Sequence, residues 1–169
     1  MKQLLTALAI FSISSLTFIA CNDKEEVDKK DDIRPTFDIA GAKKIIDSLN
    51  VVFGSMVSKG DSVGLASLYT SDAKLMVPNM PTASGRSSIQ SAFAGLFAEM
   101  GTPGLTLTTS DIWGTEELIT EVGTYTMTDK AGKQVDKGKY IDLWKMEDGK
   151  WKLHRDIFNS DLPPMAPPK

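Results

Sequence analysis

The residues of this sequence that are best suited to acid–base chemistry lie close together near its C-terminal end. Asp142, Asp156 and the only histidine, His154, occur in two runs rich in β-branched and aromatic residues. Carboxylates and an imidazole in one site can shift each other's pKa values enough to exchange protons near neutral pH. The three are therefore the candidate catalytic residues. The alternative is a hydrogen-bonded network that only joins the strands.

The turn between the two runs decides which side chains share a face. Glu147-Asp148-Gly149 separates them, and a glycine after acidic residues between such runs is typical of a β-hairpin. A two-residue loop would place Trp144 opposite Leu153, whereas a three-residue loop would place Asp142 opposite His154. We favour the three-residue loop, because it separates apolar from polar side chains better.

In this register the hairpin has one apolar and one mixed face. The apolar face carries Ile141, Leu143, Trp151, Leu153 and Ile157. The mixed face carries Tyr140, Asp142, Trp144, His154, Asp156 and Phe158. A sheet with different neighbours on its two sides needs such a difference. An uncovered apolar face would be unusual for a monomer, so the sequence predicts a homodimer through the outer sheet face.

The elements that must position this hairpin are predicted to be helices followed by strands. Apolar residues recur with helical periodicity from Ile39 to Met56, after Asp38 as N-cap. A short helix at Ser62–Tyr69, a strand at Ala73–Pro78 and a third helix after Gly85 follow. The last predicted strands are Leu105–Trp113, Glu117–Thr128, Lys139–Met146 and Trp151–Phe158. Helices followed by a run of strands indicate the α+β class.

The composition is that of an ordinary globular protein, with 41% hydrophobic and 24% charged residues among 169. A single cysteine and a single histidine exclude a zinc site of the usual spacing and an intramolecular disulfide. The sequence also lacks a phosphate-binding loop, so we expect no metal and no cofactor. Without residues 1–20 the net charge is −4, which argues against nucleic acid as a partner.

The N-terminal stretch predicts an exported, lipid-anchored protein. Lys2 and the apolar run Leu4–Ala20 are typical of a signal peptide, here residues 1–20. Phe18-Ile19-Ala20-Cys21 resembles a bacterial lipobox, in which Cys21 would carry the lipid; the alternative is a buried or free thiol. Lys24-Glu25-Glu26 resembles a short signal for the outer face of the outer membrane. The expected location is therefore the cell envelope.

The rest of the chain divides into three parts. Residues 21–35 are almost all charged and should form a solvated tether. Residues 36–161 are long enough for one domain with a core of its own. Residues 162–169 are rich in proline and should be extended.

The order of the predicted elements resembles a known superfamily. After the long helix come Gly60-Asp61, Leu68-Tyr69-Thr-Ser-Asp72-Ala73, Gly85 and Gly149-Lys-Trp-Lys-Leu-His-Arg-Asp156. Over residues 38–161 this order is similar to the nuclear transport factor 2-like superfamily, and most to its SnoaL-like, ketosteroid-isomerase-related branch. The resemblance implies a cone-shaped, curved mixed sheet wrapped on a long N-terminal helix and two shorter helices. It also implies a pocket inside the cone and frequent dimerisation through the outer sheet face.

The resemblance carries over only part of the isomerase chemistry. The tyrosine that donates to the substrate in the isomerases matches Phe53 here, and the carboxylate base matches Val77, before Pro78. Only the second acid of the oxyanion hole has a counterpart, Asp142. We therefore do not expect steroid isomerisation itself.

The register and the resemblance together define a set of candidate ligand-binding residues. Those on the expected pocket face, besides the three candidate catalytic residues, are Glu121, Tyr125, Tyr140, Trp144 and Phe158; Phe53, Tyr69 and Trp113 are further aromatic candidates. Aromatic residues are more often plain core than ligand contacts. The favoured function is binding of a small, partly apolar molecule. The alternatives are an isomerase, cyclase or dehydratase that uses acid–base chemistry, and a dimeric interaction module.

Overall fold

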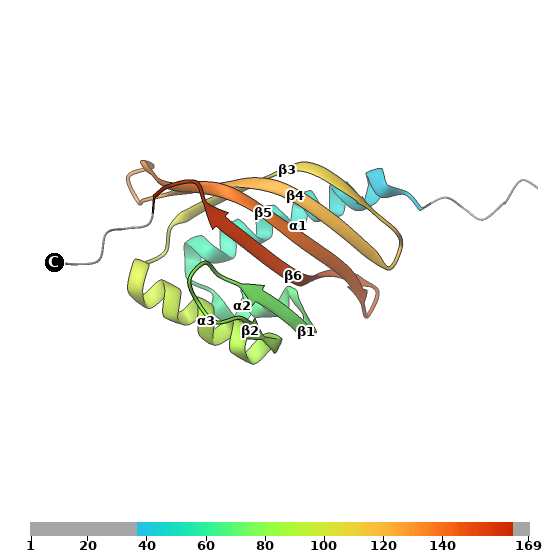
Figure 1. The fold of residues 1–169 in the computed structure, drawn as a ribbon, viewed down its shortest axis with the longest axis horizontal. Coiled ribbons are helices and arrows are strands. Elements are labelled where there is room, and N and C mark those ends of the chain that lie inside the picture. The colour runs from blue at the N-terminus through green and yellow to red at the C-terminus, as the bar shows by residue number, and fades with distance from the viewer. Residues whose placement is uncertain (1–36, 164–169) are drawn as a thin grey trace, which may run out of the picture. The chain divides into compact units, whose positions relative to one another are not determined.

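The computed structural model describes residues 37–163. The predicted signal peptide, Cys21, the whole charged tether and most of the proline-rich tail lie outside the described residues. Helices come first and most of the strands later, which confirms the predicted α+β class (Figure 1). The elements are α1 (Ile39–Lys59), α2 (Ser62–Ser67), β1 (Tyr69–Met76), β2 (Ala83–Ser84), α3 (Gly85–Met100), β3 (Gly104–Gly114), β4 (Leu118–Thr128), β5 (Gln134–Glu147) and β6 (Lys150–Ser160).

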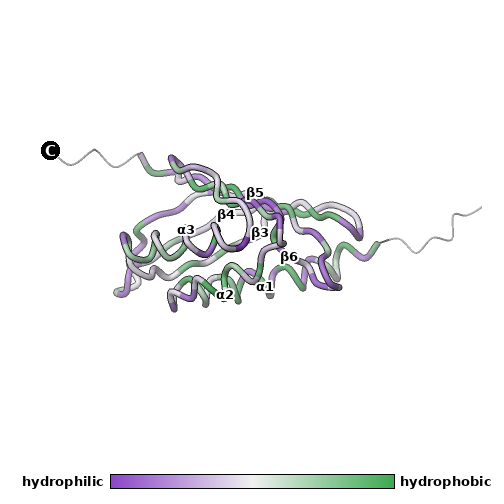
Figure 2. Tube along the Cα trace, turned by 90° about the horizontal axis from the view of Figure 1, so that it is seen from below, coloured by the Kyte–Doolittle hydropathy of each residue, from purple (hydrophilic) through white to green (hydrophobic). Residues whose placement is uncertain are grey.

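The strands form one mixed sheet in the order β2-β1-β6-β5-β4-β3. All neighbouring strands are antiparallel except β1 and β6, which run parallel. The sheet is curved and does not close on itself, and the helices cover its concave face (Figures 1 and 2). The predicted sheet wrapped on one long and two shorter helices is confirmed. Between residues 37 and 163, none of the helices is long and apolar enough to cross a membrane.

Helix α1 has clear sequence signals at both ends. The side chain of Asp38 accepts a hydrogen bond from the backbone N–H of Gly41 at 2.8 Å, as an N-cap does. Gly60 ends the helix in the left-handed conformation. In between, Gly54 lets the helix approach β3 closely, because a Cβ at that position would lie 2.5 Å from the carbonyl oxygen of Leu105. Helix α1 is therefore held directly against the sheet.

Aromatic rings fill the space between the helices and the sheet. The ring of Phe53 lies 6.4 Å from that of Tyr69 and 5.9 Å from that of Phe93, measured between centroids. Trp144, Trp151 and other apolar side chains of the inner sheet face complete the core. These side chains form the core between the helices and the inner face of the sheet.

The β5–β6 hairpin has the register that we did not favour. Its loop has two residues, Asp148 and Gly149, both with positive φ, which is typical of the two-residue turns that match strand twist. Trp144 therefore lies opposite Leu153. The register then shifts at His154, an extra residue that forms a β-bulge.

The bulge changes which side chains share a face. Beyond it, Asp142 lies opposite Asp156, and the predicted pairing of Asp142 with His154 is wrong. The predicted apolar face is also wrong in part, because Trp151 and Leu153 point into the core and are buried. Three members of that face remain on the outside: Ile141, Leu143 and Ile157.

Other element boundaries differ by a few residues. Tyr69 begins strand β1, whereas the sequence suggested the end of a helix there. Strand β5 begins at Gln134, five residues before the predicted start at Lys139, and the two-residue strand β2 was not predicted. The start of β1 matters for the site described next, because it turns the Tyr69 side chain inward.

Candidate functional site

Three buried carboxyl groups form a row across the inner face of the sheet. Glu121 on β4 lies opposite Asp142 on β5, which lies opposite Asp156 on β6. Their exposed fractions are only 0%, 5% and 7%. Acidic side chains opposite one another on paired strands destabilise a sheet, and burying a charge is costly unless it is hydrogen-bonded. The surroundings of these groups must therefore compensate.

Glu121 is compensated by hydrogen-bond donors from three directions. Its carboxylate accepts from Asn50 Nδ2 at 2.8 Å, Tyr140 Oη at 2.7 Å and Trp144 Nε1 at 2.8 Å, and Thr109 Oγ1 lies at 2.7 Å. Asn50, Thr109 and Tyr140 lie at Oε1 and Trp144 lies at Oε2, so both oxygens of the carboxylate have a donor. Burial and the neighbouring Glu121 charge raise the pKa of Tyr140 well above its usual value. The Tyr140 hydroxyl therefore keeps the proton that it donates.

A glycine places the Tyr140 hydroxyl on Glu121. Gly123 lies opposite Tyr140 on the neighbouring strand, and a Cβ there would lie 2.3 Å from Cζ of the tyrosine ring. No real Cβ comes that close, so only glycine leaves the space that the ring occupies. The ring crosses strand β4 and brings its hydroxyl to Glu121, two residues before Gly123.

The two aspartates are compensated differently. Tyr69 donates a hydrogen bond of 2.5 Å to Oδ2 of Asp156. Asp142 and Asp156 are hydrogen-bonded to each other, which two carboxyl groups can do only when one of them carries a proton. Within residues 37–163, Oδ1 of Asp142 is the one buried side-chain oxygen or nitrogen to which no N–H or O–H group donates. Asp142 is thus the least satisfied group of the row.

Burial controls the protonation of this pair. Burial, then the charges of Asp156 and Glu121, raise the pKa of Asp142 well above its usual value. Burial also raises the pKa of Asp156 to about 6, although its hydrogen bonds with Tyr69 and Asp142 act in the opposite direction. Every one of these influences on Asp142 raises its pKa, whereas hydrogen bonds oppose the rise at Asp156, so Asp142 holds the shared proton and Asp156 accepts from both Asp142 and Tyr69.

His154 does not join this row. Its Nδ1 lies 3.0 Å from Oγ1 of Thr70, 3.2 Å from Nη1 of Arg155 and 3.4 Å from Oδ1 of Asp72. Burial, and then the charge of Arg155, lower the pKa of the imidazole, although Asp72 raises it. The structure therefore brings together two of the three candidate catalytic residues, Asp142 and Asp156, and separates the third, because His154 sits in the bulge.

The candidate ligand-binding residues divide into two groups. Those in or against the carboxyl row are Glu121, Tyr140, Trp144, Tyr69 and Phe53. Tyr125 and Phe158 pack edge to face with each other at 5.8 Å between ring centroids, and the Tyr125 hydroxyl donates to Asp136 at 2.9 Å. Trp113 is half exposed near the end of β3. These last three do not contribute a hydrogen bond to the carboxyl row.

Sequence reasoning missed two members of the site. Asn50 occupies a buried position of α1, in line with the apolar residues Ile46 and Phe53. A polar residue on the apolar stripe of a helix is a signal that could have been noticed. Thr109 carries no such signal; its hydroxyl lies 2.9 Å from Oδ1 of Asp47 as well as close to Glu121, and it joins α1 to β3 and β4.

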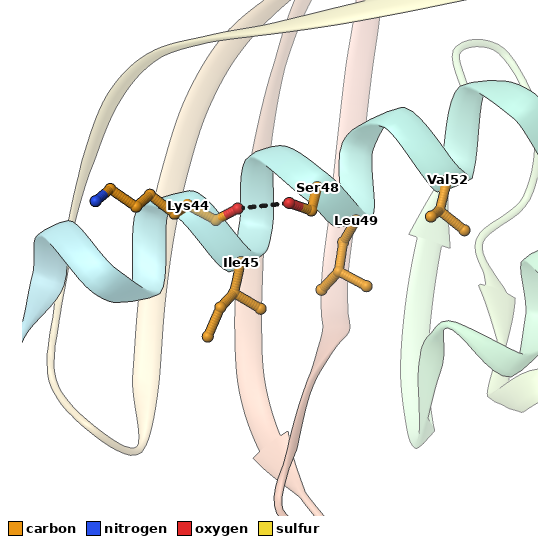
Figure 3. Close-up of a pocket in the computed structure, with 5 residues that line it drawn as sticks. All are labelled: Lys44, Ile45, Ser48, Leu49 and Val52. Atoms are coloured by element: carbon orange, nitrogen blue, oxygen red, sulfur yellow. Dashed lines mark hydrogen bonds between the residues drawn. The ribbon is translucent and has the colours of Figure 1, made fainter.

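A separate surface pocket lies along α1. Its volume is about 390 Å³, and it is lined by Lys44, Ile45, Ser48, Leu49 and Val52 (Figure 3). Three of the five are aliphatic, and Ser48 donates to the carbonyl oxygen of Lys44 at 2.8 Å. None of the three buried carboxyl groups lines this pocket. It is therefore distinct from the interior site.

Comparison with known proteins identifies the family. Residues 53–154 match the SnoaL-like domain family, which is more than half of the chain. The chain belongs to this family, a member of the nuclear transport factor 2-like superfamily, as the resemblance implied. No sequence among the curated proteins matches it.

Solved structures agree on the fold. A protein of unknown function with a cystatin-like fold from Nostoc punctiforme has a TM-score of 0.64 at 21% identity, covering 76% of this chain and 96% of its own. A ketosteroid isomerase-like protein from Erwinia carotovora atroseptica has a TM-score of 0.59 at 19% identity, covering 71% and 96%. A nuclear transport factor 2-like protein with a cystatin-like fold from Novosphingobium aromaticivorans has a TM-score of 0.59 at 15% identity, covering 70% and 81%. At these identities the likeness concerns the fold alone.

The shared proton predicts an unusual pH dependence of stability. Because the pKa values of Asp142 and Asp156 are raised on folding, the folded state binds more protons than the unfolded state above about pH 4. The free energy of unfolding should therefore fall as the pH rises through 6. In Asp142→Asn the amide can donate to Asp156 without a titrating proton. From pH 4 to pH 8, the free energy of unfolding of this variant should rise relative to that of wild type by on the order of 1–3 kcal/mol. Urea unfolding at each pH measures this difference.

The matched control for this measurement is Glu116→Gln, which neutralises an exposed acid. It should follow the wild-type profile. Parallel profiles for wild type and Asp142→Asn would contradict the shared proton.

Proposed function

We propose that this SnoaL-like domain binds a small, partly apolar molecule in its interior, beside Asp142, as a lipid-anchored component of the bacterial cell envelope. The observation that carries the proposal is the buried Oδ1 of Asp142, to which no described N–H or O–H group donates. Buried polar atoms nearly always have a partner, and leaving one without a partner costs about 1–3 kcal/mol. A donor on a ligand would supply that partner, and the surrounding aromatic rings would pack against its apolar part.

Binding is favoured over catalysis because the two donors best placed for a substrate oxygen are already engaged. Tyr69 and Asp142 both donate to Asp156. A general acid or base must reach the proton that it transfers, and these groups reach one another. Phe53 and Val77 stand where the isomerases have their tyrosine and base, which also argues against that reaction.

An isomerase, cyclase or dehydratase is the second candidate, on one specific observation. The raised pKa of Asp142 favours its neutral carboxylic acid form, and such a group can donate a hydrogen bond to a developing negative charge. This function would require the substrate to displace Asp156 from its two donors.

Binding can be tested by native mass spectrometry of the purified protein, first as isolated and then against a library of small apolar molecules. Wild type should retain a bound molecule, and Asp142→Asn should bind it at least about tenfold more weakly, a loss of about 1.4 kcal/mol. Glu116→Gln should bind as wild type does. If wild type binds no member, or if Asp142→Asn binds equally well, the interior is not a receptor site.

The anchor is a separate part of the proposal and rests on the position of Cys21 after the apolar run 4–20. Cys21→Ala should move the protein from the membrane fraction to the soluble fraction, because the acyl chains would be missing. A Cys21→Ala variant that remains with membranes after a high-salt wash would place the anchor elsewhere.

We further propose a homodimer through the outer sheet face. An apolar row crosses this face from β1 to β4, where Met76, Ile157, Ile141 and Val122 lie opposite one another in turn. Ile141 and Ile157 are exposed, as a patch covered by a second copy would be in the isolated chain. Ile141→Asp should give a monomer in sedimentation at micromolar concentration. The control Ser91→Asp, at an exposed position of helix α3, should remain a dimer. A monomeric wild type would end this proposal.

A further inference from the structure

One side of helix α1 is apolar and lies at the surface. Ile45, Leu49 and Val52 recur at helical spacing and line the pocket of about 390 Å³ along this helix (Figure 3). Ile45 is 52% and Val52 is 40% exposed, and Leu49 packs in part against the core. We call these three residues the α1 side stripe. An apolar stripe on a helix normally faces a partner.

The fold of the described domain does not supply this partner. Asp47 and Gly54 lie about 180° around the helix from Ile45, and this opposite edge contacts the sheet. There Asp47 accepts a hydrogen bond from Thr109 Oγ1 at 2.9 Å, and Gly54 lies against the backbone of Leu105. The buried positions of α1 lie between the two edges and face the core; they include Ala42, Ile46, Phe53 and Val57. The α1 side stripe is therefore left on the surface of residues 37–163.

The shape of the pocket indicates what kind of partner it fits. All five of its lining residues belong to α1, so the pocket has no opposite wall. A site for a small molecule encloses most of its ligand. A stable interface with a second copy needs roughly 20–30 residues on each side. A broad surface that approaches the helix from one side is the better match.

The predicted lipid anchor is connected to the end of α1 at which the stripe begins. Phe37 packs edge to face on Trp151 at 6.1 Å between ring centroids, just before α1 starts at Ile39. Residues 22–36 connect Phe37 to Cys21, and at about 3.5 Å per residue they can span at most about 50 Å. With a rise of about 1.5 Å per residue, the whole stripe lies within about 20 Å of the start of the helix. A lipid on Cys21 would thus keep the stripe close to the bilayer.

The charges of α1 also match a lipid surface. Its only acidic residue, Asp47, forms an ion pair with Lys43 at 2.8 Å, whereas Lys44 and Lys59 are exposed. Lysines beside an apolar helix face are typical of helices that lie in the membrane interface. They are attracted to anionic headgroups.

We propose that the α1 side stripe lies on the lipid bilayer to which the chain is anchored, with Lys44 toward anionic headgroups. This inference rests on the lipid anchor of the proposed function and specifies which side of the domain faces the membrane. Three aliphatic side chains bind a bilayer only weakly by themselves. The anchor makes the contact intramolecular, so a weak contact is sufficient.

The inference is tested with a nitroxide label on Ser48→Cys in the full chain, anchored in vesicles of phosphatidylethanolamine and phosphatidylglycerol. Ser91→Cys on α3 is the matched control, because both serines are exposed and donate to the carbonyl oxygen four residues earlier, at 2.8 and 3.1 Å. Collisions of the label with a water-soluble nickel chelate should be severalfold fewer at position 48 than at position 91. In the Cys21→Ala background without vesicles, the two positions should be similarly accessible.

A charge in the stripe should remove the contact but leave the anchor. Ile45→Glu or Val52→Glu should restore access of the chelate to the label at position 48, while the protein stays in the membrane fraction. Val135→Glu, at a valine of β5 that is 48% exposed, should leave the label protected. Ile45 and Val52 are not buried, so both variants should keep the wild-type urea midpoint. Protection that survives both substitutions would overturn the inference.

The remaining outcomes separate this contact from the anchor. If the chain is anchored but the label is as accessible at position 48 as at position 91, only the inference is wrong. If position 48 is protected in the Cys21→Ala background without lipid, a second copy or another segment covers the stripe, and the inference is wrong as well. If the chain without an introduced cysteine takes up the label, Cys21 is a free thiol, and the anchor and the inference fail together.

Discussion

The structure depends on how the domain accommodates three carboxyl groups in a row on the inner face of its sheet. Glu121, Asp142 and Asp156 are opposite one another on neighbouring strands, an arrangement that is unfavourable unless each group is neutralised or hydrogen-bonded. Much of the polar chemistry in the core serves this need. Asn50 on helix α1 donates to Glu121, and Tyr69 at the start of β1 donates to Asp156. Gly123 leaves space for the ring of Tyr140. Helix, strand and glycine positions are thus coupled through one buried cluster.

The β-bulge at His154 creates this row. Without the extra residue, the alternation from Leu153 would place Arg155, and not Asp156, opposite Asp142 on the inner face. The bulge turns Trp151 and Leu153 into the core on one side and Asp156 inward on the other. The bulge therefore places an acid opposite Asp142 where unbroken pairing would place the basic side chain of Arg155. Apolar residues at these positions would make a simpler core that is no less stable, so stability alone does not explain the carboxyl row.

Much of the fold could be predicted from the sequence, because periodicity, caps and turn residues are local signals. Asp38 and Gly60 define α1, and the superfamily follows from the order of elements. The site could be predicted only in part. Asp142, Asp156 and Glu121, which the sequence analysis placed on one face, do lie together, but their pairing depended on a loop length and a bulge. The Asp148-Gly149 dipeptide is typical of a two-residue turn. We favoured a three-residue loop because it separates apolar from polar side chains better, but that separation holds only if side chains alternate without a break along both strands. No local pattern reveals a bulge, and Thr109 becomes part of the site only through tertiary packing.

The central claim is that the buried carboxyl groups of Asp142 and Asp156 share one proton. The most direct measurement is a carbon-13 NMR titration of the side-chain carboxyl groups of Asp142 and Asp156, assigned with the two Asp→Asn variants. The account predicts two separate steps that belong to the pair, with the later step, the loss of the shared proton, well above the ordinary aspartate value. If both carboxyl groups titrate together near the ordinary aspartate value of about 3.9, the pair carries no shared proton and the account of the site is contradicted.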